Sequence, residues 1–205
     1  MIKVIDYRAG NASSVLHALD SIGHQAELSR TAADLDGASH IILPGVGSAA
    51  ATIESLQELN ILPALENAIQ QRKTPFLGIC IGMQILFDHS EEDDMPCLGW
   101  ISGRVVKFDI GKLRVPQMGW NKVQFPDGAF EGDMASDYFY FVNSYYAKPA
   151  DESVVWGIAD YGAPFAAAVR QDNIYATQFH IEKSGAAGLE LLQGFLNLKT
   201  GGTTC

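Results

Sequence analysis

The stretch Pro75-Phe76-Leu77-Gly78-Ile79-Cys80-Ile81-Gly82-Met83-Gln84 places a cysteine, flanked by glycines, between an apolar run and a helical pattern. This order is typical of a nucleophile elbow, in which a strand turns sharply into a helix and exposes the nucleophile at the turn. The glycines let neighbouring backbone pass close to the turn. The first N–H groups of the following helix then favour the thiolate form and can stabilise an oxyanion beside the sulfur.

A second stretch supplies the base that a cysteine nucleophile needs. Residues 174–182 alternate as a strand does, and they end with His180 and Glu182 two positions apart. Residues two apart on a strand share a face, so the carboxylate can orient the imidazole while the imidazole faces the thiol. We therefore predict a triad of Cys80, His180 and Glu182, with a structural buried cysteine as the alternative. The other histidines are interpreted as structural: His17, His24, His40 and His89.

Composition limits the class of protein. With 205 residues, 47% of them hydrophobic and 19% charged, we expect one compact domain spanning residues 1–205. A net charge of −10 argues against a nucleic-acid partner. No apolar run reaches the ~18 residues of a membrane span, and the first residues lack a secretory pattern, so a cytoplasmic protein without membrane contact is expected.

Cysteine usage argues against metal and disulfide chemistry. The three cysteines, Cys80, Cys97 and Cys205, are odd in number and lack the spacing of zinc ligands. Cys97 and Cys205 are interpreted as structural or incidental thiols. We expect no metal site and no cofactor.

The order of segments predicts an α/β fold with a mainly parallel central sheet flanked by helices. In the first half, short apolar runs alternate with helical patterns, and the second half is richer in strand-like runs, for which additional antiparallel strands are expected. Strands are predicted over residues 2–7, 25–29, 40–43, 75–79, 104–108, 122–125, 138–145, 154–159, 166–170 and 174–179. Helices are predicted over residues 11–22, 48–59, 62–72 and 186–198.

Three further segments could carry chemistry. Pro44-Gly45-Val46-Gly47-Ser48 should lie at the same sheet edge as Cys80, because ligands bind at the carboxyl ends of parallel strands. It could complete an oxyanion hole; a phosphate loop and a plain tight turn are the alternatives. Arg8-Ala9-Gly10-Asn11 is either a helix cap or a functional loop. Glu91-Glu92-Asp93-Asp94 is interpreted as a solvated turn, with a ligand role left open.

The quoted residues resemble the class I, or triad-type, glutamine amidotransferases. The cysteine elbow and His-x-Glu mark the family, and Met-Gly-Trp-Asn and Phe-Val-x-Ser-Tyr are similar to the glutaminase branch that serves imidazole glycerol phosphate synthase in histidine biosynthesis. The segments run from end to end of the chain: Asp6-Tyr7-Arg8-Ala9-Gly10-Asn11, Pro44-Gly45-Val46-Gly47, Leu77-Gly78-Ile79-Cys80-Ile81-Gly82-Met83-Gln84, Val115-Pro116-Gln117-Met118-Gly119-Trp120-Asn121, Tyr140-Phe141-Val142-Asn143-Ser144-Tyr145 and Gln178-Phe179-His180-Ile181-Glu182-Lys183-Ser184.

The resemblance implies a flavodoxin-like class I amidotransferase domain and a mechanism. Cys80 attacks the side-chain amide of glutamine, His180 moves protons and Glu182 orients His180. Ammonia leaves, and water hydrolyses the thioester to glutamate. By the same resemblance, N–H groups around Ile81, Val46 and Gly47 form the oxyanion hole, and the glutamine pocket includes Gln84, Glu92, Ser144 and Tyr145.

A partner is also implied by the resemblance. In this family branch, ammonia passes within a heterodimer to a (β/α)₈ synthase subunit that makes imidazole glycerol phosphate and aminoimidazole carboxamide ribotide. Candidate interface residues are Asn11, Trp120, Asn121, Tyr140 and Lys183. Trp120 and Tyr140 as core aromatics, and Lys183 as part of the last helix, are the structural alternatives.

The chain departs from the family pattern at three positions. Ile181 stands where proline is usual between the histidine and the glutamate, and Gln117 and Asn143 stand where histidine is frequent. Isoleucine still favours an extended backbone, so the triad geometry is expected to persist. The competing functions are an amidotransferase that serves another acceptor, a non-catalytic binding module, and a stand-alone cysteine hydrolase.

Overall fold

The computed structural model describes residues 1–8, 11–109, 111, 113–130 and 134–199. Cys205, and Ala9 and Gly10 of the predicted first loop, lie outside these residues. The strands are β1 (Ile2–Ile5), β2 (Ala26–Ser29), β3 (His40–Leu43), β4 (Phe76–Ile79), β5 (His89–Ser90), β6 (Met95–Pro96), β7 (Gly103–Lys107), β8 (Gln117–Gln124), β9 (Ser136–Asn143), β10 (Tyr145–Pro149), β11 (Val155–Asp160), β12 (Pro164–Gln171) and β13 (Ile174–Thr177).

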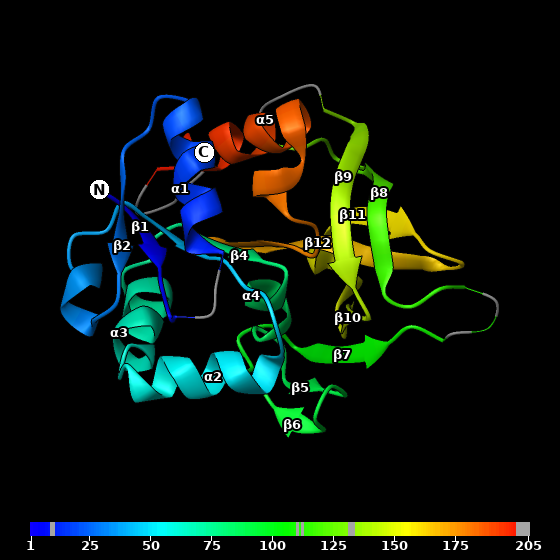
Figure 1. Cartoon of the computed structure of the whole chain (residues 1–205), viewed down its shortest axis with the longest axis horizontal. Helices are drawn as coiled ribbons and strands as arrows, with labels where there is room; N and C mark the ends of the chain where they lie inside the picture. The colour runs from blue at the N-terminus through cyan, green and yellow to red at the C-terminus, as the bar shows by residue number, and fades with distance from the viewer. Residues whose placement is uncertain (9–10, 110, 112, 131–133, 200–205) are drawn as a thin grey trace.

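Helices flank the sheet, as Figure 1 shows, with α1 and α5 on one side and α2 and α3 on the other. The α-helices are α1 (Ala12–Ser21), α2 (Ala49–Glu58), α3 (Leu62–Glu66), α4 (Ile81–Gln84) and α5 (Gly185–Leu196). Shorter helical turns are η1 (Ala32–Leu35), η2 (Asn67–Gln71), η3 (Glu152–Val154) and η4 (Ile181–Lys183). No helix among these described elements is long and apolar enough to cross a bilayer.

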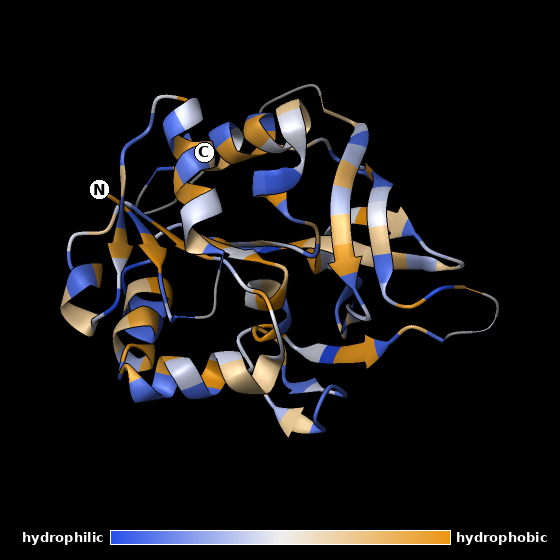
Figure 2. Cartoon of the chain, in the orientation of Figure 1, coloured by the Kyte–Doolittle hydropathy of each residue, from blue (hydrophilic) through white to orange (hydrophobic). Residues whose placement is uncertain are grey.

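The central sheet confirms the predicted α/β fold. Its strands run β2-β1-β3-β4-β13 with parallel pairing throughout, and β12 then continues the sheet antiparallel to β13. Every residue of β3 and β4 is buried, because helices cover both faces of the parallel part. In Figure 2 these central strands are mainly hydrophobic, and the helices turn polar residues outward.

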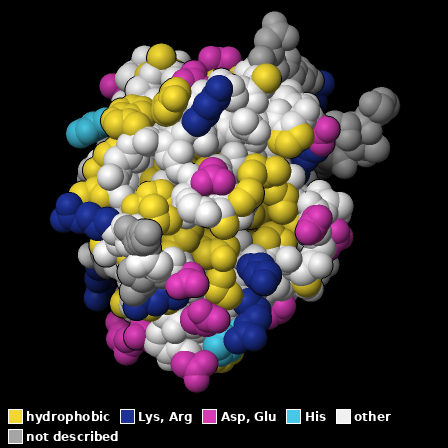
Figure 3. All heavy atoms as spheres, turned by 90° about the vertical axis from the view of Figure 1, so that its right-hand side faces the viewer, with side chains coloured by type: hydrophobic (Ala, Val, Ile, Leu, Met, Phe, Trp, Pro, Cys, Tyr) yellow, Lys and Arg dark blue, Asp and Glu magenta, His cyan; other side chains and the backbone are white. Residues whose placement is uncertain are grey.

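The second half of the chain builds the antiparallel extension. β12 pairs with β10, β11 and β13, and β11 leads to the β8–β9 pair, in which β9 lies beside α5 and η4 (Figure 1). Apolar side chains gather on this end of the molecule in Figure 3. A cavity of about 360 Å³ there is lined in part by Phe108, Tyr146 and Phe165.

Several predicted boundaries were wrong, for identifiable reasons. β8 begins at Gln117 rather than at residue 122, because its pairing with β9 continues through Met118-Gly119-Trp120, where the sequence does not alternate. The strand expected over 138–145 divides at Ser144 into β9 and β10, which pair with different neighbours. The helix expected over 62–72 is present within one residue of its predicted end, as α3 followed directly by the π-helical turn η2.

Candidate active site

Cys80 sits at the sharp turn between β4 and α4. Its backbone has φ +56°, which is a left-handed conformation, and its N–H donates to the carbonyl oxygen of Thr177 at 2.7 Å. Such a conformation costs a non-glycine residue about 1–3 kcal/mol and persists only where the surroundings enforce it. The strained turn predicted from the sequence is therefore present, with Cys80 at the carboxyl edge of the parallel strands.

Two glycines enforce this turn by allowing backbone to pack on backbone. A Cβ added to Gly82 would collide with the carbonyl oxygen of Leu43 at the end of β3, and one added to Gly78 would collide with the carbonyl oxygen of Gly82. Only hydrogen fits at either position. The ends of β3, β4 and α4 are consequently held at one fixed spacing around the cysteine.

His180 and Glu182 lie next to each other and behind Cys80. The imidazole Nδ1 is 2.9 Å from Glu182 Oε1, and the Glu182 side chain is only 1% exposed. The predicted contact is present, but its predicted geometric basis was wrong. β13 ends at Thr177, and residues 181–183 form the 3-10 turn η4, so a helical turn rather than strand alternation brings the two side chains together.

The protonation of His180 is set by its two neighbours. Burial alone would lower the pKa of His180, but hydrogen bonds to Cys80 and Glu182, together with their negative charges, raise it to about 9. The ring is therefore protonated at neutral pH. Because folding favours the protonated ring, this contribution to stability is full below pH 6.5 and is lost as pH rises through about 9.

Replacing Glu182 with glutamine is expected to lower the pKa of His180 from about 9, because the amide keeps the side-chain shape and removes the negative charge. NMR titration of the labelled histidine rings would measure this change. His40, which is bonded instead to the carbonyl oxygen of Leu198, is the internal control. An unchanged His180 titration would show that Glu182 does not set its protonation.

Asn11 contacts the triad carboxylate. Its Nδ2 donates to Glu182 Oε1 at 3.2 Å, and its Oδ1 accepts from the Ser14 hydroxyl at 2.7 Å. Asn11 occupies the N-cap position of α1, yet its side chain makes no capping hydrogen bond there. The loop was expected to be either a helix cap or a functional loop. The Asn11 side chain does not cap α1.

A cavity of about 250 Å³ opens beside the cysteine, and it brings most of the predicted site together. Its walls include two triad members, Cys80 and His180, with Glu182 behind them. They also include the three oxyanion candidates, Ile81, Val46 and Gly47, and the four glutamine-binding candidates, Gln84, Glu92, Ser144 and Tyr145. The remaining walls are Pro116, Val142 and Asn143, for which the sequence predicted no pocket role.

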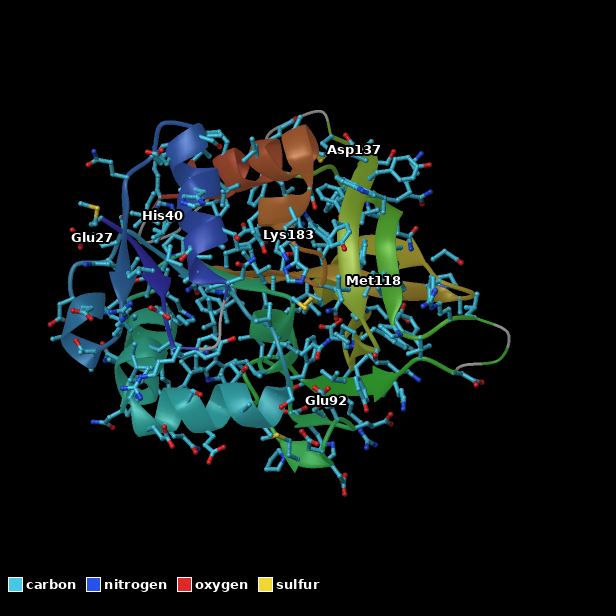
Figure 4. All side chains as sticks on the ribbon, viewed as in Figure 1. Glu27, His40, Glu92, Met118, Asp137 and Lys183 are labelled. Carbon is cyan, nitrogen blue, oxygen red and sulfur yellow. The ribbon has the colours of Figure 1, made fainter. Side chains whose placement is uncertain are left out.

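Glu92 brings a carboxylate to the cavity from the turn between β5 and β6. Its Oε2 accepts from the N–H of Ala49 at the start of α2, at 3.3 Å, and partial burial raises the pKa of Glu92. Figure 4 shows Glu92 beside the small strands below the sheet. Its acidic neighbours Asp93 and Asp94 are exposed, so the turn is solvated and Glu92 alone reaches the cavity.

The Pro44–Gly47 turn forms one wall of the cavity. Tyr7 lies beside it, and its hydroxyl accepts from the Thr52 hydroxyl at 3.5 Å. Burial raises the pKa of Tyr7, so the phenol is neutral. Val46, Gly47, with φ +98°, and Ile81, at the first turn of α4, are the backbone neighbours of the cavity.

The interface candidates differ in what they contact. Trp120 is 57% exposed and packs edge-on against Tyr140, with ring centroids 6.1 Å apart. Lys183 is exposed on η4 and lies beside β9 in Figure 4. The side-chain amide of Asn121 instead donates to the carbonyl oxygen of Asp160 at 2.8 Å. This hydrogen bond within the chain is a structural role for Asn121.

Gln117 and Asn143, the substitutes for histidine, face each other across β8 and β9. Both are buried, and among the described residues neither side-chain oxygen has a hydrogen-bond partner. Asn143 Nδ2 donates to the carbonyl oxygen of Tyr145 at 2.9 Å. Because amides do not titrate, these positions add no proton-linked charge beside the cavity.

Sequence reasoning missed two polar groups near Cys80. Gln178 Nε2 lies 3.7 Å from the sulfur, and Tyr7 reaches the Pro44–Gly47 turn. The position of Gln178 just after an apolar strand could have indicated a site residue. The residues next to Tyr7 in the sequence give no such indication. The part of the chain described here contains no cluster of three histidine, cysteine or acidic residues that could hold a metal ion.

Comparison with protein families gives one match along most of the chain. The glutamine amidotransferase class-I family matches residues 3–198. The imidazole glycerol phosphate synthase subunit HisH of Dehalococcoides mccartyi strain 195 is 42% identical over 204 residues, which cover 98% of each chain. Its counterpart in Herpetosiphon aurantiacus is 44% identical over 97% of this chain and 94% of the relative.

Solved structures share the fold at lower identity. A crystal structure of a glutamine amidotransferase matches with a TM-score of 0.76 at 21% identity, covering 95% of this chain and 98% of that one. PurLQS from Thermotoga maritima matches with a TM-score of 0.73 at 20% identity, covering 96% and 97% of the two chains. These matches support the architecture alone.

Proposed function

This chain belongs to the class I glutamine amidotransferases, and we propose that it is the glutaminase subunit of an imidazole glycerol phosphate synthase, acting in the cytoplasm. The observation that carries the proposal is the placement of Cys80 and His180 in one cavity of about 250 Å³, with His180 Nδ1 2.9 Å from Glu182 Oε1. Relatives at 42% and 44% identity over nearly the full chain direct the choice of acceptor.

In the proposed reaction, the Cys80 thiolate attacks the side-chain amide carbon of glutamine. The tetrahedral oxyanion is held by backbone N–H groups, with Ile81, Val46 and Gly47, which all line the cavity, as the candidates. His180 gives its proton to the departing ammonia, and Glu182 keeps the ring oriented. Water then cleaves the thioester, so that glutamine and water become glutamate and ammonia.

The cavity offers complementary groups for the amino-acid end of glutamine. The partly buried carboxylate of Glu92 suits the α-ammonium group, because a cation there would offset the cost of its burial. Ser144 and Tyr145 line the cavity from the β9–β10 junction, and Gln84 lines it from α4. We propose that these four residues select glutamine.

The β8–β9 pair is the proposed contact with a (β/α)₈ synthase subunit. Met118, Trp120 and Tyr138 are 66%, 57% and 56% exposed, and methionine, tryptophan and tyrosine are enriched at protein interfaces. The same pair is tied to the triad, since the N–H of His180 donates to the carbonyl oxygen of Tyr140 at 2.9 Å. We propose a heterodimer in which ammonia passes directly to the synthase.

Reconstitution with such a synthase subunit tests the function. We expect glutamate formation from glutamine to rise when the partner and its phosphorylated aminoimidazole carboxamide substrate are added, together with formation of imidazole glycerol phosphate. Trp120→Ala should weaken the heterodimer by about 2 kcal/mol, roughly thirtyfold in Kd, as a central aromatic anchor does. Titration calorimetry would measure the affinity, and a coupled assay would measure the glutamate.

Leu113→Ala, which removes another exposed apolar side chain, is the matched control and should leave Kd unchanged. Equal Kd values for wild type and Trp120→Ala would overturn the proposed interface. Glutamate formation that responds only to a different acceptor synthase would favour the alternative amidotransferase role. Absence of glutamate in every combination would favour a non-catalytic module.

A further inference from the structure

We propose that Gln178 is a second hydrogen-bond donor to the reacting sulfur of Cys80, held in place by Gln84. The inference rests on the proposed role of Cys80 as the nucleophile. Gln178 follows the end of β13 and is completely buried. Its Nε2 lies 3.7 Å from Cys80 Sγ, and its Oε1 accepts from Gln84 Nε2 at 3.0 Å.

The surrounding hydrogen bonds fix the orientation of both amides. The carbonyl oxygen of Tyr145 can only accept, so the Gln84 atom 3.2 Å from it must be the NH₂ group. That same NH₂ group faces Gln178, which must therefore turn its oxygen toward Gln84. The NH₂ group of Gln178 is left to face the sulfur. A chain of three hydrogen bonds thus runs from a backbone carbonyl to Cys80.

Gln84 is consequently a positioning residue as well as a wall of the cavity. Its NH₂ group is occupied by Tyr145 and Gln178, whereas its buried Oε1 has no partner among the described residues. The NH₂ end of this amide therefore positions Gln178, while the side chain also lines the cavity.

The chemical effect follows from the change of charge on sulfur. A neutral N–H donor interacts more strongly with a thiolate than with the sulfur of a thiol or thioester. Gln178 therefore favours the ionised nucleophile before attack, and it stabilises the same thiolate as the leaving group when water breaks the carbon–sulfur bond. In the proposed reaction, the proton of the thiol passes to His180.

The other groups around the sulfur are either titratable or can only accept, and the carbonyl oxygen of Val142, 3.9 Å from the sulfur, is such an acceptor. His180 is its charged partner, with Glu182 behind it, and Glu92 and Tyr145 line the cavity. Tyr7 also interacts with Cys80 electrostatically, and burial keeps its phenol neutral. The amide of Gln178 differs from all of these because it donates to the sulfur without a charge or a titration of its own.

The test is the pH dependence of Cys80 alkylation by iodoacetamide in Gln178→Met, which removes the donor and keeps the side-chain length. We expect the pH of half-maximal alkylation to rise by about one unit. In the complex, kcat for glutamine should fall roughly ten- to hundredfold with KM nearly unchanged, because Gln178 does not line the cavity. Mass analysis of the Cys80 peptide separates it from Cys97, whose pKa burial raises to about 11.

Thr177→Val is the matched control. Thr177 is equally buried and adjacent, but its hydroxyl donates to the carbonyl oxygen of Phe179 at 2.9 Å and does not bond the sulfur. Its alkylation profile should match the wild type. Gln178→Glu is the second variant, which retains an acceptor for Gln84 and replaces the donor with an oxygen. It should raise the alkylation midpoint further than Gln178→Met does.

Wild-type alkylation profiles in Gln178→Met and Gln178→Glu would overturn this inference and leave the glutaminase proposal intact. If only Gln178→Glu folds, its alkylation profile decides the question in the same way. Full glutaminase activity in Cys80→Ala would instead overturn the proposed function, whatever the alkylation profiles show. An equal rise of the alkylation midpoint in Thr177→Val would also contradict the inference. The rise would then result from a general change in structure at the end of β13.

Discussion

Replacing Cys80 with alanine is expected to reduce the rate of glutamate formation from glutamine by about three orders of magnitude or more. Removal of the catalytic nucleophile lowers kcat by a similar factor in other enzymes. The reason is that the thioester requires a sulfur at the strained turn, where Cys80 has φ +56° and alanine offers only a methyl group. A coupled glutamate assay with the reconstituted synthase would measure the loss. Synthase activity with added ammonium salt should persist, since the partner then needs no glutaminase.

Cys97→Ala provides the comparison within the same chain. Cys97 is half-buried, and burial raises its pKa to about 11, so it is a poor nucleophile at neutral pH. We expect this variant to keep the wild-type rate of glutamate formation. Retained glutaminase activity in Cys80→Ala would contradict the assignment of the nucleophile.

Gly82→Ala is expected to lower the free energy of unfolding by about 3 kcal/mol, at the upper end of overpacking effects. The added methyl group would meet the carbonyl oxygen of Leu43, which is main chain and cannot swing aside. Either β3 or the α4 turn must move, and both carry parts of the cavity wall. Urea denaturation followed by circular dichroism would measure the loss, and glutaminase activity should fall with it.

Gly37→Ala is the control that separates this packing effect from the backbone strain of placing alanine at a positive φ. A Cβ at Gly37 meets nothing within 4 Å, although φ is +66°. This variant should cost only about 1–2 kcal/mol, the penalty for a left-handed conformation. If Gly82→Ala costs no more than Gly37→Ala, the close packing of the elbow does not limit stability.

Short-range patterns predicted the fold, and they predicted that Cys80 lies at a sharp turn and that His180 contacts Glu182, because these features depend on residues close in sequence. Apolar runs at 40–43 and 75–79 became the fully buried β3 and β4. The Cys80 turn was readable from its glycines, and the pairing of His180 with Glu182 from their spacing. The strand geometry predicted for this pairing was wrong. Two residues separated by one position are close both on a strand and in a 3-10 turn, and η4 is a 3-10 turn.

Contacts between distant segments were beyond local reasoning. Asn11 reaches Glu182 across 171 positions, and Gln84 reaches Gln178 across 94. Neither pair has a local spacing that indicates a bond, because each depends on which strands become neighbours. Likewise, the contact of the Tyr7 hydroxyl with Thr52 follows from the parallel order β1-β3-β4, which places the segments after these strands side by side.

The position of β13 in the sheet has a consequence for biosynthesis of the chain. β4, which ends at the nucleophile, pairs on one side with β3 and on the other with β13, nearly one hundred residues later. A nascent chain on the ribosome therefore carries an unpaired β4 edge until Thr177 has emerged, and such an edge is prone to aggregation. The hydrogen bond from Cys80 to Thr177 also forms only then. The surroundings of the Cys80 sulfur are thus completed only after residue 177 has been synthesised.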